Sequence, residues 1–273
     1  MAIKRYKPTT PARRQMTGFD FSEITTQKPD KGLLQKKSNR AGRSAGKISM
    51  RRRGGGAKQR YRLVDLKRKK MDIPAKVVSI EYDPNRTCRI AKIIYDDGWK
   101  SYILAPQGLK IGDKVITSQD GSLKPGNRLK LKNIPTGSQI YNIEINPGKG
   151  GQIVRAAGQF ASLLSKEEKY VTIQLPSKEV RKVLSECFAS IGALSLPEKS
   201  LIKFGKAGRK RWFGRRPRVR GLAMAPNAHP HGGGEGRSSI GLSGPKSPWG
   251  KSTLGKKTRK SKPSDKLIIK RRK

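Results

Sequence analysis

The chain has 273 residues, of which 63 are Lys or Arg and 19 are Asp or Glu, and its formal net charge is +44 at pH 7. So large an excess of one sign opposes a compact fold and attracts polyanions, which favours nucleic acid as the partner over a membrane surface or a small-molecule substrate. The sequence holds no long apolar run, secretory h-region or lipidation motif, so we expect a soluble, unprocessed, intracellular protein without a membrane partner.

The positive charge is concentrated at the two ends of the sequence. Residues 1–60 contain 17 Lys and Arg against 3 acidic residues, and residues 201–273 contain 22 against 2. Residues 61–200 contain 24 against 14 and hold most of the aliphatic side chains. This distribution predicts a core with a basic extension at each end. Because the extensions can bury little apolar surface, we expect them to be disordered alone and to order against a partner.

A triple arginine followed by a triple glycine lies where the first extension meets the core. Arginine forks bind phosphate through two parallel hydrogen bonds, and glycine lets backbone N–H groups approach the same anion. This pattern indicates an anion site without specifying RNA. We assign this segment and the short basic run at 68–70 to RNA binding. The residues are Arg51, Arg52, Arg53, Gly54, Gly55, Gly56, Lys58, Arg60, Arg68, Lys69 and Lys70.

The core is predicted to be mainly β. Residues 75–82 and 87–95 are rich in β-branched side chains and are separated by a turn signal, Asp83-Pro84-Asn85-Arg86, and a third strand is expected at 102–104. Residues 141–145 and 171–175 alternate apolar and polar side chains, which is typical of half-buried strands. The spacing favours two small barrels over residues 61–125 and 126–200.

The second extension, residues 201–273, is rich in Gly, Lys and Arg and carries several further basic clusters. Its aromatic side chains, such as Trp249, would have nothing to pack against in a purely solvated tail, so they indicate a binding partner. About 6–10 phosphate contacts already make nucleic-acid affinity fall by roughly 10³–10⁵ between 50 and 200 mM salt, and these extensions can make more. The basic and aromatic residues assigned to RNA binding here are Arg211, Trp212, Arg215, Arg216, Arg218, Arg220, Arg237, Lys256, Lys257, Arg259 and Lys260.

The stretch 229–237 holds both histidines of the chain and a carboxylate, Glu235. A metal site is disfavoured because a structural zinc site needs four ligands, and Cys88 and Cys187 are expected to be buried thiols. No metal or cofactor is therefore expected. General acid-base chemistry by His229 is conceivable, since histidine titrates near neutrality. The favoured interpretation is a Gly-rich loop that folds into an RNA crevice, with contacts from His229, His231, Gly232, Gly233 and Gly234.

Six motifs together resemble one ribosomal family. They are residues 53–56 (RGGG), 81–86 (EYDPNR), 102–106 (YILAP), 147–151 (PGKGG), 210–212 (KRW) and 224–237 (MAPNAHPHGGGEGR). In this order they resemble the large-subunit ribosomal protein conventionally numbered two, in its bacterial form, over essentially the whole chain. Two positions depart from the family pattern. Ala228 replaces the usual acidic residue before the first histidine, and Ala57 replaces a histidine that often follows the triple glycine.

The resemblance implies an OB-fold barrel followed by an SH3-like barrel, in a cytoplasmic protein of the ribosome. It implies a primary binder of large-subunit ribosomal RNA with roles in subunit association, transfer RNA binding and the peptidyl transferase centre. Its partners would be that RNA, small-subunit RNA at a bridge and other ribosomal proteins. Two other hypotheses stay open: direct catalysis of peptidyl transfer by His229, and a free-standing nucleic-acid chaperone.

Overall fold

The computed structural model describes residues 3–37, 41–235, 238–255 and 257–272. It divides into two compact units. The barrel unit comprises residues 1–38, 58–206 and 264–273, and the arm unit comprises residues 39–57 and 207–263. This division differs from the boundaries expected at residues 60, 125 and 200, which stay predictions.

The first sheet of the barrel unit has four antiparallel strands in the order β10-β7-β8-β9. Their bounds are Ala75–Glu81 for β7, Ile90–Tyr95 for β8, Lys100–Leu104 for β9 and Lys114–Val115 for β10. Along β7 buried and exposed side chains alternate, so that one face of the strand lines a core. Val64 adds a parallel bridge to Tyr102 beside this sheet. The three strands predicted in this region are confirmed.

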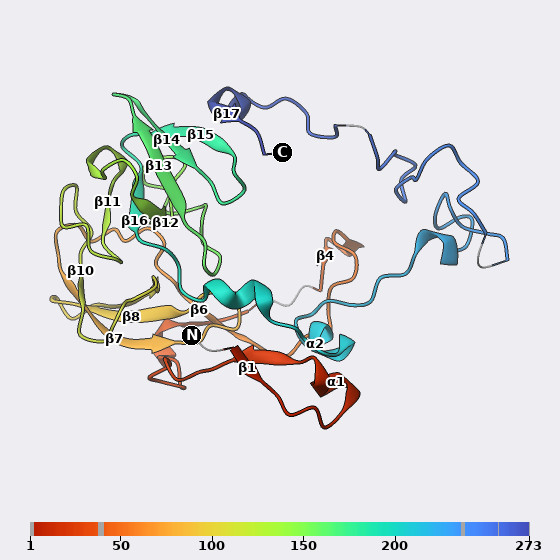
Figure 1. Ribbon diagram of the computed structural model, residues 1–273, viewed down its shortest axis with the longest axis horizontal. Helices are drawn as coiled ribbons and strands as arrows, with labels where there is room; N and C mark the ends of the chain where they lie inside the picture. The colour runs from red at the N-terminus through yellow and green to blue at the C-terminus, as the bar shows by residue number, and fades with distance from the viewer. Residues whose placement is uncertain (1–2, 38–40, 236–237, 256, 273) are drawn as a thin grey trace. The chain divides into compact units, whose positions relative to one another are not determined.

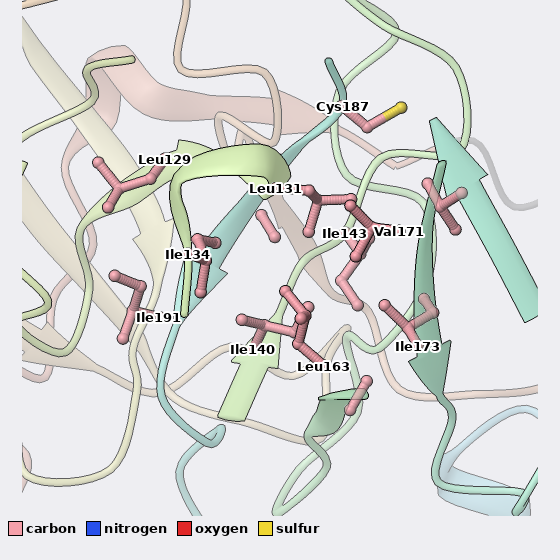
Figure 2. Packing of buried hydrophobic residues seen from close by; sticks show 13 residues of the cluster. Leu129, Leu131, Ile134, Ile140, Ile143, Leu163, Val171, Ile173, Cys187 and Ile191 are labelled. Atoms are coloured by element: carbon pink, nitrogen blue, oxygen red, sulfur yellow. The ribbon is translucent and has the colours of Figure 1, made fainter. Parts of the chain in front are cut away.

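The second sheet has seven strands in the order β11-β16-β12-β13-β14-β15-β17 (Figure 1). Their bounds are Arg128–Lys130 for β11, Gln139–Tyr141 for β12, Ala161–Lys166 for β13, Tyr170–Gln174 for β14, Val180–Leu184 for β15, Phe188–Ile191 for β16 and Ile268–Lys270 for β17. Figure 2 shows the side chains of Leu131, Ile143 and Val171 turned toward one another in its interior. Burial of such aliphatic groups is the main stabilising term.

The two sheets confirm the expected fold class, a mainly β protein with an OB-fold barrel followed by an SH3-like barrel. Short elements make up the rest of the regular structure. In the barrel unit these are β1 (Ile3–Arg5), α1 (Pro11–Arg14), β2 (Thr17–Phe19), η1 (Lys31–Leu33), β3 (Leu34–Lys36), β6 (Arg60–Arg62), η2 (Leu131–Asn133) and η3 (Pro197–Leu201). In the arm unit they are β4 (Arg43–Ser44), β5 (Lys47–Ile48), α2 (Ala207–Trp212) and η4 (Gly221–Ala223), and η5 is Pro263–Leu267.

The strand predicted at 141–145 is wrong beyond Tyr141. Asn142 adopts a left-handed conformation with φ of +50°, which ends β12, and Ile143 makes only an isolated bridge to Ile153. Asn142 and Glu144 are also buried, although a half-buried strand would expose them. Glu144 is polar for a different reason, which is its buried ion pair with Arg128.

The C-terminal strand β17 returns to the SH3-like barrel. It pairs antiparallel with β15, with Lys270 opposite Val180 and Ile268 opposite Arg181 (Figure 1). Residues 207–263 are thus joined to the barrel unit at both ends instead of forming a free tail. A loop fixed at both ends has fewer conformations than a tail, so less entropy is lost when a partner orders it.

A buried ion pair lies at the start of the SH3-like barrel. Arg128 is 0% exposed and donates to Glu144 Oε1 at 2.9 Å and to the Asn142 carbonyl at 2.9 Å. Glu144 also accepts hydrogen bonds from the backbone N–H groups of Gly150 and Phe188. Burial lowers the pKa of Arg128, and the charge of Glu144 opposes that effect.

Replacement of one partner of this ion pair should destabilise the folded protein. The substitution Arg128→Met leaves the Glu144 carboxylate buried without its cation, so the free energy of unfolding should fall by about 3–5 kcal/mol. The double variant Arg128→Met/Glu144→Gln removes both charges and should recover part of that loss. Urea denaturation of the three proteins measures this difference. Equal losses in the single and double variants would contradict the role given to the pair.

Candidate nucleic-acid interface

The two basic segments that the sequence singled out lie side by side within the arm unit. Arg53 and Arg215 form an antiparallel bridge. Three backbone hydrogen bonds of 2.9–3.1 Å flank it, from Gly54 to Gly214, from Ala57 to Trp212 and from Arg216 to Arg52. Segments more than 150 residues apart in the sequence therefore share one backbone ladder, which carries arginines on both of its strands.

Close approach of the two backbones explains one of the three glycines. A Cβ atom on Gly56 would lie 2.8 Å from the nitrogen and 2.9 Å from the Cα of Gly214. Both neighbours are backbone atoms, which cannot move aside as a flexible side chain would. Gly54 and Gly55 have φ values of +119° and +65°, which L-residues with a side chain rarely adopt. This glycine run is thus needed for the fold of the ladder, whether or not it also approaches phosphate.

Most cations assigned to RNA binding are exposed. The arm unit's ranges contain a single acidic residue, Glu235, so its field is strongly positive. The exposed members of the predicted set are Arg51, Arg53, Lys58, Arg60, Lys69, Arg211, Arg215, Arg216, Arg218, Arg220, Lys257, Arg259 and Lys260, together with Trp212. Arg237 and Lys256, which belong to the same prediction, lie outside the described residues.

Arg68 and Lys70 are engaged within the barrel unit. The Arg68 side chain is buried and donates to the carbonyl oxygens of Gly126 and Ile116. Lys70 pairs with Asp97, and its ammonium lies 5.2 Å from the centre of the Trp99 ring. RNA contact by these two residues stays a prediction, and the burial of Arg68 disfavours it for that residue.

A cavity of about 490 Å³ opens in the arm unit. It is lined by twelve residues from three segments of the chain: Arg51 and Arg52; Arg218, Val219, Arg220, Gly221, Met224 and His229; and Lys246, Ser247, Pro248 and Thr253. Five of these residues are cationic and none is acidic. The sequence did not assign Lys246, Ser247 or Thr253 to the site, because nothing in their local pattern places them opposite the arginines.

His229 is held in the wall of this cavity and is 8% exposed. Its Nδ1 atom accepts a hydrogen bond of 3.0 Å from the His231 backbone N–H. The two rings lie edge to face, 4.8 Å apart. Gly221 lies against the His229 ring, since a Cβ on that glycine would lie 2.5 Å from Cε1. The Gly232 N–H donates to the His229 carbonyl and closes the loop.

Both imidazoles accept hydrogen bonds from backbone amides. His231 Nε2 accepts from the Lys246 N–H at 2.9 Å, as His229 Nδ1 accepts from His231. A ring nitrogen that accepts a hydrogen bond carries no proton, so the proton of a neutral His229 lies on Nε2. Burial, the His231 ring and Arg51 all lower the pKa of His229, the first most strongly. The geometry thus favours a neutral His229 ring whose Nδ1 lone pair is already used.

The structure also bears on metals and membranes. In the described ranges, His, Cys, Asp and Glu residues form no group of three or more that could hold a metal ion. Both cysteines are buried as free thiols, and burial raises the pKa of Cys88 to about 11. In the same part of the chain no helix has both the length and the apolar character needed to cross a membrane.

An OB-fold barrel, an SH3-like barrel and a strongly basic ladder with exposed arginines define the class, which is that of nucleic-acid-binding β-barrel proteins. Residues 30–117 match the family described as Ribosomal Proteins L2, RNA binding N-terminal domain, and residues 124–250 match Ribosomal Proteins L2, C-terminal domain. The chain belongs to this family of ribosomal proteins. It is a structural, RNA-binding constituent of the cytoplasmic ribosome, and the resemblance noted in the sequence is confirmed.

The ladder can be tested at its closest contact. Gly56→Ala places a methyl group 2.8 Å from a backbone atom, so the pairing should open and the amide protons of Gly54 and Ala57 should exchange faster with solvent. Gly208→Ala is the matched control, because a Cβ there meets nothing within 4 Å and the residue lies in helix α2. Hydrogen exchange followed by NMR distinguishes them. Equal exchange rates in wild type and Gly56→Ala would refute the close contact.

The state of His229 can be measured by titration. We expect a pKa below the ordinary value of 6.5, and ¹⁵N chemical shifts that show the proton on Nε2. Because the open loop binds a proton at a higher pH than the closed loop, the closed form should lose stability as pH falls below about 6.5. A pKa above 6.5, or a proton on Nδ1, would contradict the hydrogen bond from His231.

Proposed function

We propose that the protein is a primary binder of large-subunit ribosomal RNA and that its arm unit threads into that RNA. Through this binding it supports subunit association, including a bridge to small-subunit RNA, transfer RNA binding and the peptidyl transferase centre. The RNA contacts are made by the exposed members of the predicted set. The observation that carries the proposal is the arm unit's backbone ladder, which presents exposed arginines in a unit with one carboxylate.

Physical chemistry supports threading over surface attraction. The described parts of the arm unit hold only short regular elements, and large apolar side chains such as Trp249 and Leu254 are left exposed. A unit of this kind gains stability when RNA neutralises its charge and covers its aromatic rings. A chaperone without a fixed target would gain nothing from a glycine such as Gly56, which is required because the backbone of Gly214 and Trp212 lies so close to it.

Direct catalysis by His229 has less support. A general base needs a free lone pair within reach of the proton that it removes. In this loop Nδ1 of His229 and Nε2 of His231 already accept backbone N–H groups. Ala228 supplies no carboxylate to orient the ring. The role that fits is positioning of the loop that lines the cavity.

Sedimentation tests the binding. Fractions of a sucrose gradient, probed before and after a high-salt wash, should show the protein on the large subunit in both cases. A surface-bound protein should leave, since 6–10 exposed phosphate contacts alone lose roughly 10³–10⁵ in affinity between 50 and 200 mM salt. Release as free protein would refute threading and favour the chaperone hypothesis.

Replacement of His229 separates the two roles of the ring. If the ring positions the loop, subunits formed with His229→Ala should incorporate less protein, and peptide-bond formation should fall in proportion. His229→Gln keeps an acceptor for the His231 N–H and should restore part of the incorporation. Normal incorporation of His229→Ala with loss of peptide-bond formation would instead establish catalysis.

A further inference from the structure

We propose that the cavity of the arm unit binds one unpaired nucleotide of ribosomal RNA, with its phosphate among the arginines and its base stacked on Trp249. This inference rests on the proposed function and names the ligand of one site within it. Two observations carry it: the cationic lining of the cavity, and the exposed Trp249 ring beside it. Arg51 takes part in both.

The cavity is built for a single anion. Arg51, Arg52, Arg218, Arg220 and Lys246 line it, and its described lining includes no carboxylate that would neutralise them. Like charges that face one space repel one another, and this repulsion is relieved when an anion enters. A guanidinium binds phosphate by two parallel hydrogen bonds, which a lysine cannot do. Four arginines in the lining therefore match the hydrogen-bonding geometry of a phosphate group.

Two lining groups are fixed before any ligand arrives. The Arg52 Nη2 atom donates to the Val219 carbonyl at 3.3 Å, which holds its guanidinium against the wall. His229 is fixed through Nδ1, so its ring is held in the lining of the cavity. Groups held in place lose less entropy on binding, which favours affinity for a ligand of matching shape.

Trp249 lies next to the cavity at the turn of a hairpin. Lys246 bridges Ser252, the Ser247 N–H donates to Lys251, and the Gly250 N–H donates to Ser247. The hairpin fixes the backbone on either side of the ring, yet Trp249 is 75% exposed. A large aromatic ring held out to solvent in this way is typical of a stacking platform for an unpaired base.

Arg51 connects the ring to the cavity. Its guanidinium lies 5.3 Å from the centre of the Trp249 ring and also lines the cavity. One cation thus contacts both the ring that would hold a base and the space that would hold a phosphate. Bases in a duplex are already stacked on their neighbours and cannot lie on a protein ring, so the ligand is a nucleotide splayed out of a helix.

The test uses large subunits assembled with the full-length protein. Ethylnitrosourea, which ethylates accessible RNA phosphates, should show one short stretch protected by wild type and exposed with Arg218→Gln/Arg220→Gln. Among the described residues, the side chains of Arg218 and Arg220 make no hydrogen bond or ion pair with the rest of the protein, so the variant should still fold. Arg43→Gln with Lys47→Gln is the matched control, because it removes two charges from β4 and β5 of the same unit, outside the cavity. Arg218→Lys/Arg220→Lys should give partial protection.

The proposed contact between Trp249 and the base is tested separately, by treating the same subunits with dimethyl sulfate. A base next to the protected phosphates should become reactive in Trp249→Ala and stay protected in Trp249→Phe, which keeps an aromatic face. If the cavity and control variants give the same phosphate pattern, or if Trp249→Ala changes no base there, the nucleotide site is refuted. Failure of the proposed function would give a different result from failure of the nucleotide site. The wild-type protein itself would then leave the subunit and protect no RNA.

Discussion

Self-repulsion of the positive charge is the constraint on which the rest of this structure depends. A chain with a net charge of +44 can fold only where burial outweighs repulsion. The barrel unit meets this condition with two aliphatic cores and with carboxylates such as Glu144, Glu186 and Asp97 that pair with cations. The arm unit has no comparable core among its described residues, and it relies on backbone hydrogen bonds and glycine contacts. Its exposed cations are then left for an external polyanion.

Arginine has two roles in this molecule, and exposure separates them. Arg68, Arg89 and Arg128 are buried and donate to backbone carbonyls or to Glu144. Arg89 is also surrounded by the rings of Phe19, Phe21 and Tyr82, which fixes the N-terminal segment on the OB-fold barrel. These side chains stabilise the fold, although each counts toward the net charge of the sequence as the exposed arginines of the ladder do. A count of charge along the sequence therefore overstates the RNA-binding surface of the barrels.

Local patterns were sufficient to predict much of the fold and less of the site. The strands β7 and β8 follow from β-branched runs on either side of a turn signal, β9 follows the turn at 96–98, and β14 follows from alternation of period two. Each of these signals lies within or beside its strand. Arg68 could not be recognised as a fold residue, because its partners at Gly126 and Ile116 are far away in the sequence. The same is true of the pairing of β17 with β15 and of Lys246 with His231. Contacts that depend on tertiary structure leave no periodic signal.

The histidine loop shows how residue type alone can mislead. Two imidazoles and a carboxylate within seven residues look like acid-base or metal chemistry in the sequence. In the arm unit, however, a protonated ring would lie among arginines, and this field together with burial lowers the pKa of His229. The backbone N–H of His231 stabilises the neutral form further by occupying the Nδ1 lone pair of His229. A neutral ring adds no charge to a lining that is already cationic, so it can lie close to the arginines. His229 is therefore best explained as an uncharged acceptor that lets the loop fold around its own excess of positive charge.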